Sequence, residues 1–151
     1  MTNMRIVIGS DHRGFHVKAK LLNLLSEWGH AVEDAGANDD QSVDYPDYAS
    51  AVARQVADGS ADRGILICGT GIGMAIAANK VRGVRAATCF DEVTAEYSRR
   101  HNDANVLCLS ADHLSPDVTE RVVKLWLNTK FEGGRHTRRI QKIDKLEDAG
   151  R

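Results

Sequence analysis

The sequence predicts an α/β sandwich built on a parallel sheet of five strands. Five short apolar segments alternate along the 151 residues with longer stretches of helical periodicity. Because helices rather than tight turns join these segments, parallel pairing and right-handed crossovers are favoured. The clearest element is Ile65 to Asn79, where an apolar strand runs through alternating glycines into an alanine-rich helix. Glycines in that position let successive backbone N–H groups turn toward one anion.

Length and composition predict a single domain over residues 1–151, long enough to bury a core without disulfides or metals. The net charge of -1 gives no bias toward nucleic acid or membrane surfaces. The cysteines, Cys68, Cys89 and Cys108, include no CxxC pair, which indicates a reducing compartment, and we expect the cytoplasm. The first residues contain only a short apolar run, so we expect no signal peptide and no membrane span.

The first part of the chain predicts a strand, a helix and a second strand. Arg5 to Gly9 is short and β-branched and ends in glycine, which is typical of a buried parallel strand. Apolar residues at helical spacing predict a helix over about Phe15 to Trp28, and the glycine behind it ends the helix. Ala31 to Asp34 predicts a weaker strand.

The middle of the chain contains the element around which the rest is organised. A polar loop from Gly36 to Pro46 leads to a helix over Tyr48 to Ala57, which Asp47 can cap. The strand Ile65 to Cys68 then runs into a glycine loop, which fits neither the strand periodicity nor the helix periodicity. An alanine-rich helix over Met74 to Lys80 follows.

The last part of the chain predicts two further strands and three helices. Val84 to Phe90 and Val106 to Leu109 are the strands, and a helix from Asp91 to about Arg100 joins them. A serine and a proline start the next helix, over about residues 115–127. A polar helix over about residues 137–146 closes the chain and can pack on a partner subunit.

We expect the binding site at the carboxyl ends of the strands, where parallel α/β sheets hold their ligands. Asp11 and His12 follow the first strand, and Cys68 with Gly69 to Gly73 ends the third. His101 lies instead at the end of a helix that leads back into the fifth strand. It therefore belongs to a different edge or serves a neighbouring subunit.

The glycine loop has two other interpretations. A dinucleotide fingerprint would need glycine or alanine where Met74 or Ile76 stands, although Asp91 lies about twenty residues on, as a ribose-binding acid would. A P-loop is excluded, because no Gly-Lys-Ser/Thr follows. A nucleotide- or phosphate-binding module without chemistry stays an alternative, and a purely structural turn is the weaker one.

Cys68 stands one residue before the loop, where a thiol can act as a nucleophile or base beside an oxyanion site. A lone cysteine is more often an inert buried thiol, and that is what we expect of Cys89 and Cys108. His12 and His16 are four residues apart and could share a helix face as metal ligands. No third ligand lies near them in the sequence, so we expect no metal.

A basic cluster beside a Gly-Gly turn is the remaining candidate. A solvated helix face is the ordinary explanation, but such a cluster also suits one phosphate group. His101 follows two arginines at a helix end, where it can simply complement the helix dipole. The cluster comprises Arg135, His136, Arg138 and Arg139.

Several sequence blocks stand in one order from about Met4 to Leu146. Together they resemble type B ribose-5-phosphate isomerase, in the family that includes the galactose-6-phosphate isomerase subunits. The resemblance implies a Rossmann-like three-layer α/β/α sandwich with a five-stranded parallel sheet and active sites at a dimer interface. The blocks are Ser10-Asp11-His12-Arg13-Gly14-Phe15, Asp44-Tyr45-Pro46, Gly64 to Gly73, Ala77-Ala78-Asn79-Lys80, Arg100-His101-Asn102 and Glu132-Gly133-Gly134-Arg135-His136.

The resemblance implies an aldose–ketose isomerisation through an enediol, with no metal or other cofactor. Cys68 is then the base that moves a proton between C1 and C2 of the sugar. His101 opens the furanose ring, and Asp11 helps to handle hydroxyl protons. The loop N–H groups hold the enediolate oxygen, and the Thr70 side chain assists them. These N–H groups belong to Gly69, Gly71, Ile72 and Gly73.

The resemblance also implies a set of substrate-binding residues. Asn102 binds the sugar from the partner subunit, and Tyr45 lines the sugar pocket. His12, Arg135 and Arg139 hold the phosphate.

Two positions distinguish this chain within the resemblance. Some family members use a glutamate a few residues after the loop as the base, but this chain has Met74-Ala75-Ile76 there, which leaves Cys68 as the candidate. Some relatives carry a phosphate-binding arginine after the fifth strand, where this chain has Asp112. A carboxylate there would repel phosphate, which leaves the choice of sugar open.

The resemblance therefore implies a cofactor-free enzyme of pentose phosphate metabolism that interconverts ribose 5-phosphate and ribulose 5-phosphate. Isomerisation of a six-carbon aldose phosphate, either allose 6-phosphate or galactose 6-phosphate, is the alternative substrate. We expect a homodimer with active sites at the subunit interface, without nucleic acid or membrane partners. The sequence does not decide between a dimer and a tetramer.

Overall fold

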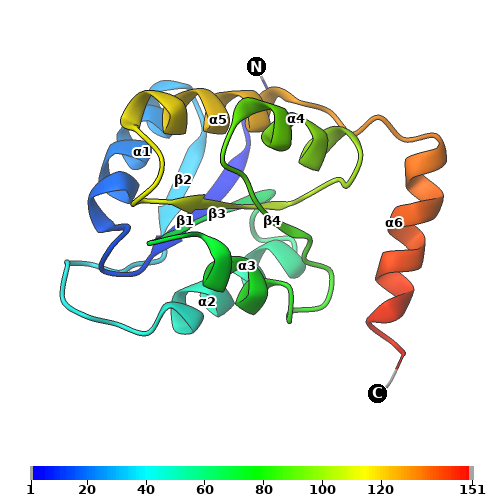
Figure 1. Cartoon of the computed structure of the whole chain (residues 1–151), viewed down its shortest axis with the longest axis horizontal. Coiled ribbons are helices and arrows are strands. Elements are labelled where there is room, and N and C mark those ends of the chain that lie inside the picture. The colour runs from blue at the N-terminus through cyan, green and yellow to red at the C-terminus, as the bar shows by residue number, and fades with distance from the viewer. Residues whose placement is uncertain (1, 150–151) are drawn as a thin grey trace.

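The computed structural model describes residues 2–149 and has an all-parallel sheet with helices on both faces (Figure 1). The sheet has the order β2-β1-β3-β5-β4. This is the predicted three-layer α/β/α sandwich. Its strands are β1 (Arg5–Ser10), β2 (Ala31–Asp34), β3 (Arg63–Cys68), β4 (Ala86–Thr88) and β5 (Val106–Ser110). Its helices are α1 (Phe15–Glu27), α2 (Tyr45–Ala57), α3 (Ile72–Ala78), α4 (Glu92–Arg100), α5 (Pro116–Asn128) and α6 (Arg135–Leu146).

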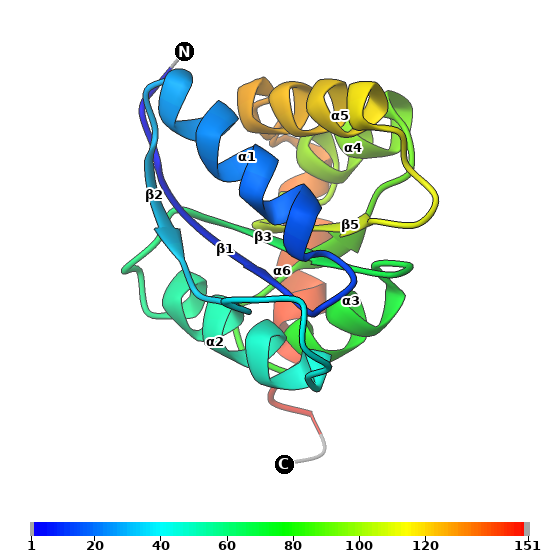
Figure 2. The ribbon, with the colours of Figure 1, turned by 90° about the vertical axis from the view of Figure 1, so that its left-hand side faces the viewer.

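Two apolar layers cover the sheet, with α1, α4 and α5 on one face and α2 and α3 on the other (Figure 2). Successive side chains of a strand point to opposite faces. In β1, Ile6 and Ile8 accordingly pack in the first layer, and Val7 packs in the second. Because both faces are covered, the central strands read as continuous apolar runs in the sequence.

The strand register brings three loops together at one edge of the sheet. Ser10 at the end of β1 pairs with Ile67 of β3, and Cys68 at the end of β3 pairs with Ser110 of β5. The chain switches direction across the sheet between β1 and β3, which is where ligands bind in such folds. The loops after β1, β3 and β5 therefore lie side by side.

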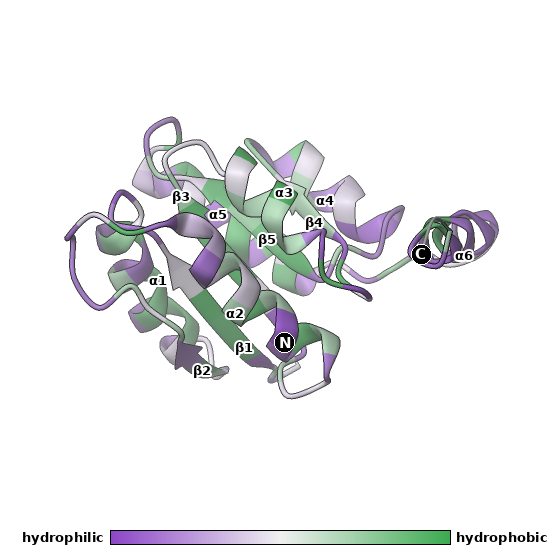
Figure 3. Ribbon diagram, turned by 90° about the horizontal axis from the view of Figure 1, so that it is seen from below, coloured by the Kyte–Doolittle hydropathy of each residue, from purple (hydrophilic) through white to green (hydrophobic). Residues whose placement is uncertain are grey.

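Helix α6 stands away from the sandwich, beyond the β4 edge (Figures 1 and 3). A groove of about 560 Å³ separates it from the end of α3 and from β4. Ile143 and Leu146 are exposed on this helix, whereas Ile140 is buried. Within residues 2–149, no helix is long and apolar enough to cross a membrane.

The start of α2 differs from the prediction. The helix begins at Tyr45 rather than Tyr48, and the N-cap position belongs to Asp44 rather than Asp47. The cause is Pro46, which we assigned to the loop. A proline suits the first helical turn, because the N–H that it lacks would have no intrahelical partner there.

Glycines also move two helix starts. We predicted starts at Met74 and Thr137, but α3 and α6 each begin two residues earlier. Gly71 and Gly134 occupy their N-cap positions with positive φ angles of 81° and 59°. A glycine can take that conformation and turn directly into a helix.

Strand β4 is shorter than the predicted Val84 to Phe90. It lies at the edge of the sheet and pairs only with β5. The side-chain amide of Asn79 hydrogen-bonds both the N–H and the C=O of Ala86, at 2.8 and 2.9 Å. A side chain therefore takes the place of a further strand at the start of this edge.

Candidate active site

The loop after β3 places a thiol beneath a turn of glycines. Cys68 is 5% exposed and packs in the layer of α2 and α3. The N–H of Gly71 donates to its Sγ at 3.1 Å. The N–H of Ile72 donates to Oγ1 of Thr70 at 3.2 Å, which leaves the Thr70 hydroxyl proton free to point elsewhere. The predicted base and the predicted assisting hydroxyl therefore lie in one turn.

The end of β5 holds this loop in place. The Ser110 hydroxyl donates to the carbonyl of Gly69 at 2.6 Å, and the N–H of Asp112 donates to the same oxygen at 3.1 Å. The hydroxyl of Thr88 donates to the carbonyl of Gly71 at 3.0 Å. Because these carbonyl oxygens are bound by the protein, the loop has a fixed shape before any ligand arrives.

The loop after β1 supplies the second part of the site. The carboxylate of Asp11 is buried and its Oδ1 accepts the N–H groups of Arg13 and Gly14, both at 3.0 Å. The Nδ1 of His12 accepts the N–H of Val43 at 3.2 Å. A neutral imidazole that accepts at Nδ1 carries its proton on Nε2, so His12 can donate to an anion.

Tyr45 reaches the same place from the start of α2. A Cβ added to Gly73 would lie 2.7 Å from the Tyr45 ring and 3.0 Å from its hydroxyl. The ring therefore covers the glycine loop from the α2 side and is 41% exposed. Tyr45 therefore lies beside the glycine loop, and its role in lining a sugar pocket stays a prediction.

A second cluster forms around His101. Its ring lies 4.7 Å from that of Tyr97 and stacks on His136 at 4.2 Å, with 11° between the ring planes. His136 is 5% exposed, and its Nε2 has no hydrogen-bond partner among the described residues. Burial, and then the neighbouring His101, lowers the pKa of His136. The stacking therefore favours the neutral form of His136 beside His101.

The structure does not bring this cluster to Cys68 within one chain. His101 ends α4 and leads into the amino end of β5, whereas Cys68 lies at the carboxyl end of β3. Asn102, which follows His101 in the sequence, is exposed and lines the groove under α6. Arg135 and Arg139 are exposed in the first turns of α6. The other predicted site residues, Gly69 to Gly73 included, lie at the carboxyl edge.

The described residues offer one candidate metal cluster, made of His101, Glu132 and His136, whose ligand atoms lie within 4.8 Å of one another. Parallel stacked rings direct their nitrogen lone pairs side by side rather than at one point. Glu132 is also bound by Arg100, at 3.2 Å. These donors fit a tetrahedral ion poorly.

Other candidates from the sequence have structural roles. His12 and His16 do not share a helix face, since α1 begins at Phe15 and His16 turns toward Asp40. The carboxylate of Asp91 caps α4 by accepting the N–H of Thr94 at 2.7 Å, which lowers the pKa of Asp91. Asp91 therefore has a structural role as the N-cap of α4.

Cys89 and Cys108 are buried apolar strand-end and strand residues, as predicted. Burial raises the pKa of both thiols.

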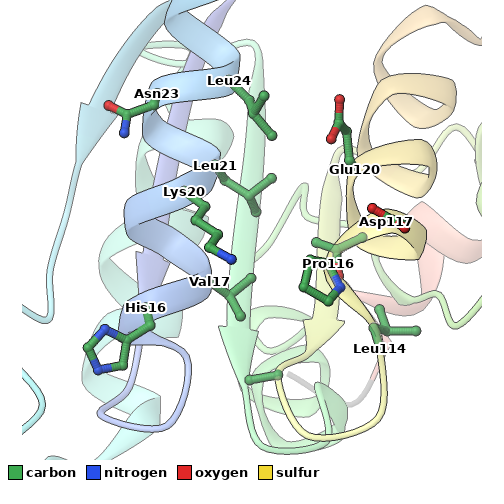
Figure 4. Close-up of a pocket in the computed structure, with 12 residues that line it drawn as sticks. His16, Val17, Lys20, Leu21, Asn23, Leu24, Leu114, Pro116, Asp117 and Glu120 are labelled. Atoms are coloured by element: carbon green, nitrogen blue, oxygen red, sulfur yellow. The ribbon is translucent and has the colours of Figure 1, made fainter.

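A separate groove of about 480 Å³ lies between α1 and α5 (Figure 4). Val17, Leu21 and Leu24 line it from α1, and Leu114 and Pro116 line it from the start of α5. None of the predicted site residues lines this groove. It is a gap between two helices of one layer and lies apart from the glycine loop.

Sequence reasoning missed one residue at the site. The guanidinium of Arg13 forms an ion pair with Asp112 and lies against Gly69. Arg13 and Asp112 are far apart in the sequence, so only the strand order brings them together.

Comparison with known proteins assigns this arrangement to a family. A model of the Ribose/Galactose Isomerase family matches residues 6–143. The chain belongs to the ribose/galactose isomerase family. Its relative in Escherichia coli, ribose-5-phosphate isomerase B, is 44% identical over 143 residues, which are 95% of this chain and 96% of the relative.

Solved structures of the ribose/galactose isomerase family have the same fold. Ribose-5-phosphate isomerase B of Clostridium thermocellum has a TM-score of 0.95 and 47% identity, covering 96% of this chain and 98% of that chain. The Mycoplasma genitalium enzyme with bound ribulose-5-phosphate has a TM-score of 0.93 and 46% identity, covering 96% and 97%. The predicted family and fold are confirmed.

Proposed function

We propose that this chain is an aldose–ketose isomerase that interconverts ribose 5-phosphate and ribulose 5-phosphate through an enediol. One observation carries the proposal: the thiol of Cys68 lies under a preformed glycine loop in a chain 46% identical to a protein that binds ribulose-5-phosphate. Removing a proton beside a carbonyl requires a base close to that carbon and fixed donors where the oxyanion develops.

The residues at the carboxyl edge supply these groups. The thiolate of Cys68 takes the proton from C2 of the open aldose, and the electron pair forms the C1–C2 double bond of the enediolate. A second proton moves from the C2 oxygen to the C1 oxygen, with the free oxygen of Asp11 as the carrier. Cys68 then returns its proton to C1, which gives the ketose. The hydroxyl of Thr70 stabilises the oxyanion.

We infer that a second copy of the chain completes each site. His101 and Asn102, with Arg135 and Arg139, lie away from Cys68 in one protomer and would open the ring and hold the phosphate in the other. Ile72 and Ile76 of α3 are exposed at 53% and 59%, and Val93 of α4 at 59%. Large apolar side chains left exposed in one protomer are available to a subunit interface. Helix α6 is joined to its own protomer through Arg85 and Asp144 at 3.3 Å, and it leaves Ile143 and Leu146 exposed for a partner.

The first test is turnover of ribose 5-phosphate. Cys68→Ala should lose about 10²- to 10⁴-fold in kcat, the usual worth of a positioned proton-transfer group, and keep its circular dichroism. Cys108→Ala is the matched control, since it removes a buried thiol of the neighbouring strand and should keep kcat. Allose 6-phosphate and galactose 6-phosphate are assayed alongside. Turnover of only a six-carbon phosphate, or equal kcat in the two variants, would contradict the proposal.

The second test mixes two inactive variants, Cys68→Ala and His101→Ala. In a two-fold dimer that shares its sites, a mixed dimer has one intact site, so random mixing should restore about a quarter of wild-type turnover. Subunits are exchanged in mild urea, and mixed dimers are counted with a tag on one variant. Mixed dimers without turnover would show that Cys68 and His101 do not act across the interface.

A further inference from the structure

An ion pair stands at the mouth of the glycine loop. Arg13 lies in the loop after β1, and Asp112 lies two residues past β5. Both backbones are anchored at the site: the N–H of Arg13 donates to Asp11 at 3.0 Å, and the N–H of Asp112 donates to the carbonyl of Gly69 at 3.1 Å. The pair therefore joins the loops after β1 and β5 across the loop after β3.

The guanidinium of Arg13 fills the space beside Gly69. A Cβ at Gly69 would lie 2.5 Å from Nη1 of Arg13 and 2.8 Å from its Nε. No side chain fits there unless the guanidinium moves. A long surface side chain is usually mobile, but here a carboxylate holds one side of the guanidinium and a glycine backbone supports its face.

The geometry leaves donors free. A guanidinium has five N–H donors, and one carboxylate accepts at most two of them in the bidentate arrangement. Arg13 is 53% exposed at the side chain, so its remaining donors face solvent at the mouth of the loop. His12, the preceding residue, accepts the N–H of Val43 at Nδ1 and so carries a further donor at Nε2 in its neutral form.

The ion pair also removes a repulsion. A bare carboxylate at Asp112 would oppose a phosphate dianion near the site, at a cost that rises as water is excluded. With Arg13 bound to it, the Asp112 side chain holds a cation in place instead. A planar fork of N–H donors matches phosphate better than the point charge of a lysine does.

We propose that Arg13 binds the phosphate group of the substrate and that Asp112 is the residue that positions its guanidinium over Gly69. This rests on the proposed function, since it takes a sugar phosphate as the ligand. The role of Arg13 differs from those of Cys68 and Thr70, because it acts on substrate binding and not on the reacting carbons.

The test compares KM and kcat for ribose 5-phosphate in wild type and Arg13→Ala. We expect KM to rise roughly tenfold to a hundredfold, as for the loss of a charge-assisted hydrogen bond, with kcat within about threefold. The matched control is Arg5→Ala, which breaks an ion pair of similar exposure with Asp62 at the opposite edge of the sheet. It should leave KM unchanged.

Two further variants separate positioning from binding. Asp112→Ala should raise KM less than Arg13→Ala does, because the arginine is still present but no longer held. Arg13→Lys should recover only part of the binding, since an ammonium lacks the planar fork. An unchanged KM in Arg13→Ala, or a fall in kcat alone, would overturn the proposal.

Binding of inorganic phosphate, measured by calorimetry, gives a readout without turnover. Arg13→Ala should weaken it, and Arg5→Ala should not. If the wild-type protein turns over no sugar phosphate, the proposed function fails, and this measurement still decides whether Arg13 holds phosphate. Equal phosphate affinity in wild type and Arg13→Ala would refute the role of Arg13 in either case.

Discussion

Gly71 is the residue at which the shape of the site can be tested by stability alone. Its φ angle is +81°, and a Cβ there would lie 3.0 Å from Cγ2 of Thr88 and 3.1 Å from the backbone carbon of Leu109. Gly71→Ala should therefore lower the free energy of unfolding for two separate reasons. The left-handed conformation costs about 1–2 kcal/mol. Overpacking against the central strand β5, which cannot move aside, costs about 1–3 kcal/mol more.

Gly59→Ala isolates the cost of placing an alanine in the left-handed conformation. Its φ angle is +84°, and nothing lies within 4 Å of the added Cβ. The assay is urea unfolding followed by circular dichroism, with all proteins at one concentration because an oligomer's stability depends on it. Gly71→Ala should lose about 1–3 kcal/mol more than Gly59→Ala does, and it should also lose turnover. Equal losses within about 0.5 kcal/mol would refute the close packing of the loop on β5.

Two further variants test the buried polar groups that support the sheet. His30 is buried, its Nδ1 accepts the N–H of Met4 at 3.1 Å, and burial lowers its pKa. The unfolded chain therefore binds the proton more readily, so stability should fall as pH drops below about 6.5. His30→Asn should flatten the dependence of the urea midpoint between pH 7.5 and 5.5, and an unchanged slope would contradict this cause. Lys18→Met removes a buried ammonium that donates to Asp34 and to the carbonyl of Ala37, both at 2.6 Å. It should cost about 1–3 kcal/mol in urea unfolding, and a neutral result would show that the ion pair adds no net stability.

The fold could be predicted because each central strand carries its own signal. Short apolar runs that end at or just before glycine or a small polar residue marked β1, β3 and β5, and the helices between them implied a parallel sheet. The carboxyl-edge rule then placed Asp11, His12 and Cys68 together without knowledge of the strand order. The position of His101 at another edge followed from its place at a helix end.

The structural features that the sequence did not predict depend on residues that are distant along the chain. The pairing of Arg13 with Asp112 requires β1 and β5 to flank β3, and no local pattern encodes that order. Pro46 is equally suited to a loop and to a first helical turn, so the start of α2 was assigned wrongly. The length of β4 was overestimated because the predicted segment Val84 to Phe90 extends beyond Ala86–Thr88, the residues that pair with β5.

The strand order also has a consequence for synthesis of the chain on the ribosome. β4 emerges before β5, yet its only partner in the sheet is β5, which also separates it from β3. The edge of β3 and the loop after it therefore have no β5 partner until Ser110 has been synthesised, about 40 residues later. At usual rates of synthesis this delay is a few seconds. Until then the nascent chain has an open strand edge beside Cys68. We expect a stalled chain that exposes residues up to Thr88 to be alkylated at this thiol faster than one that exposes Ser110.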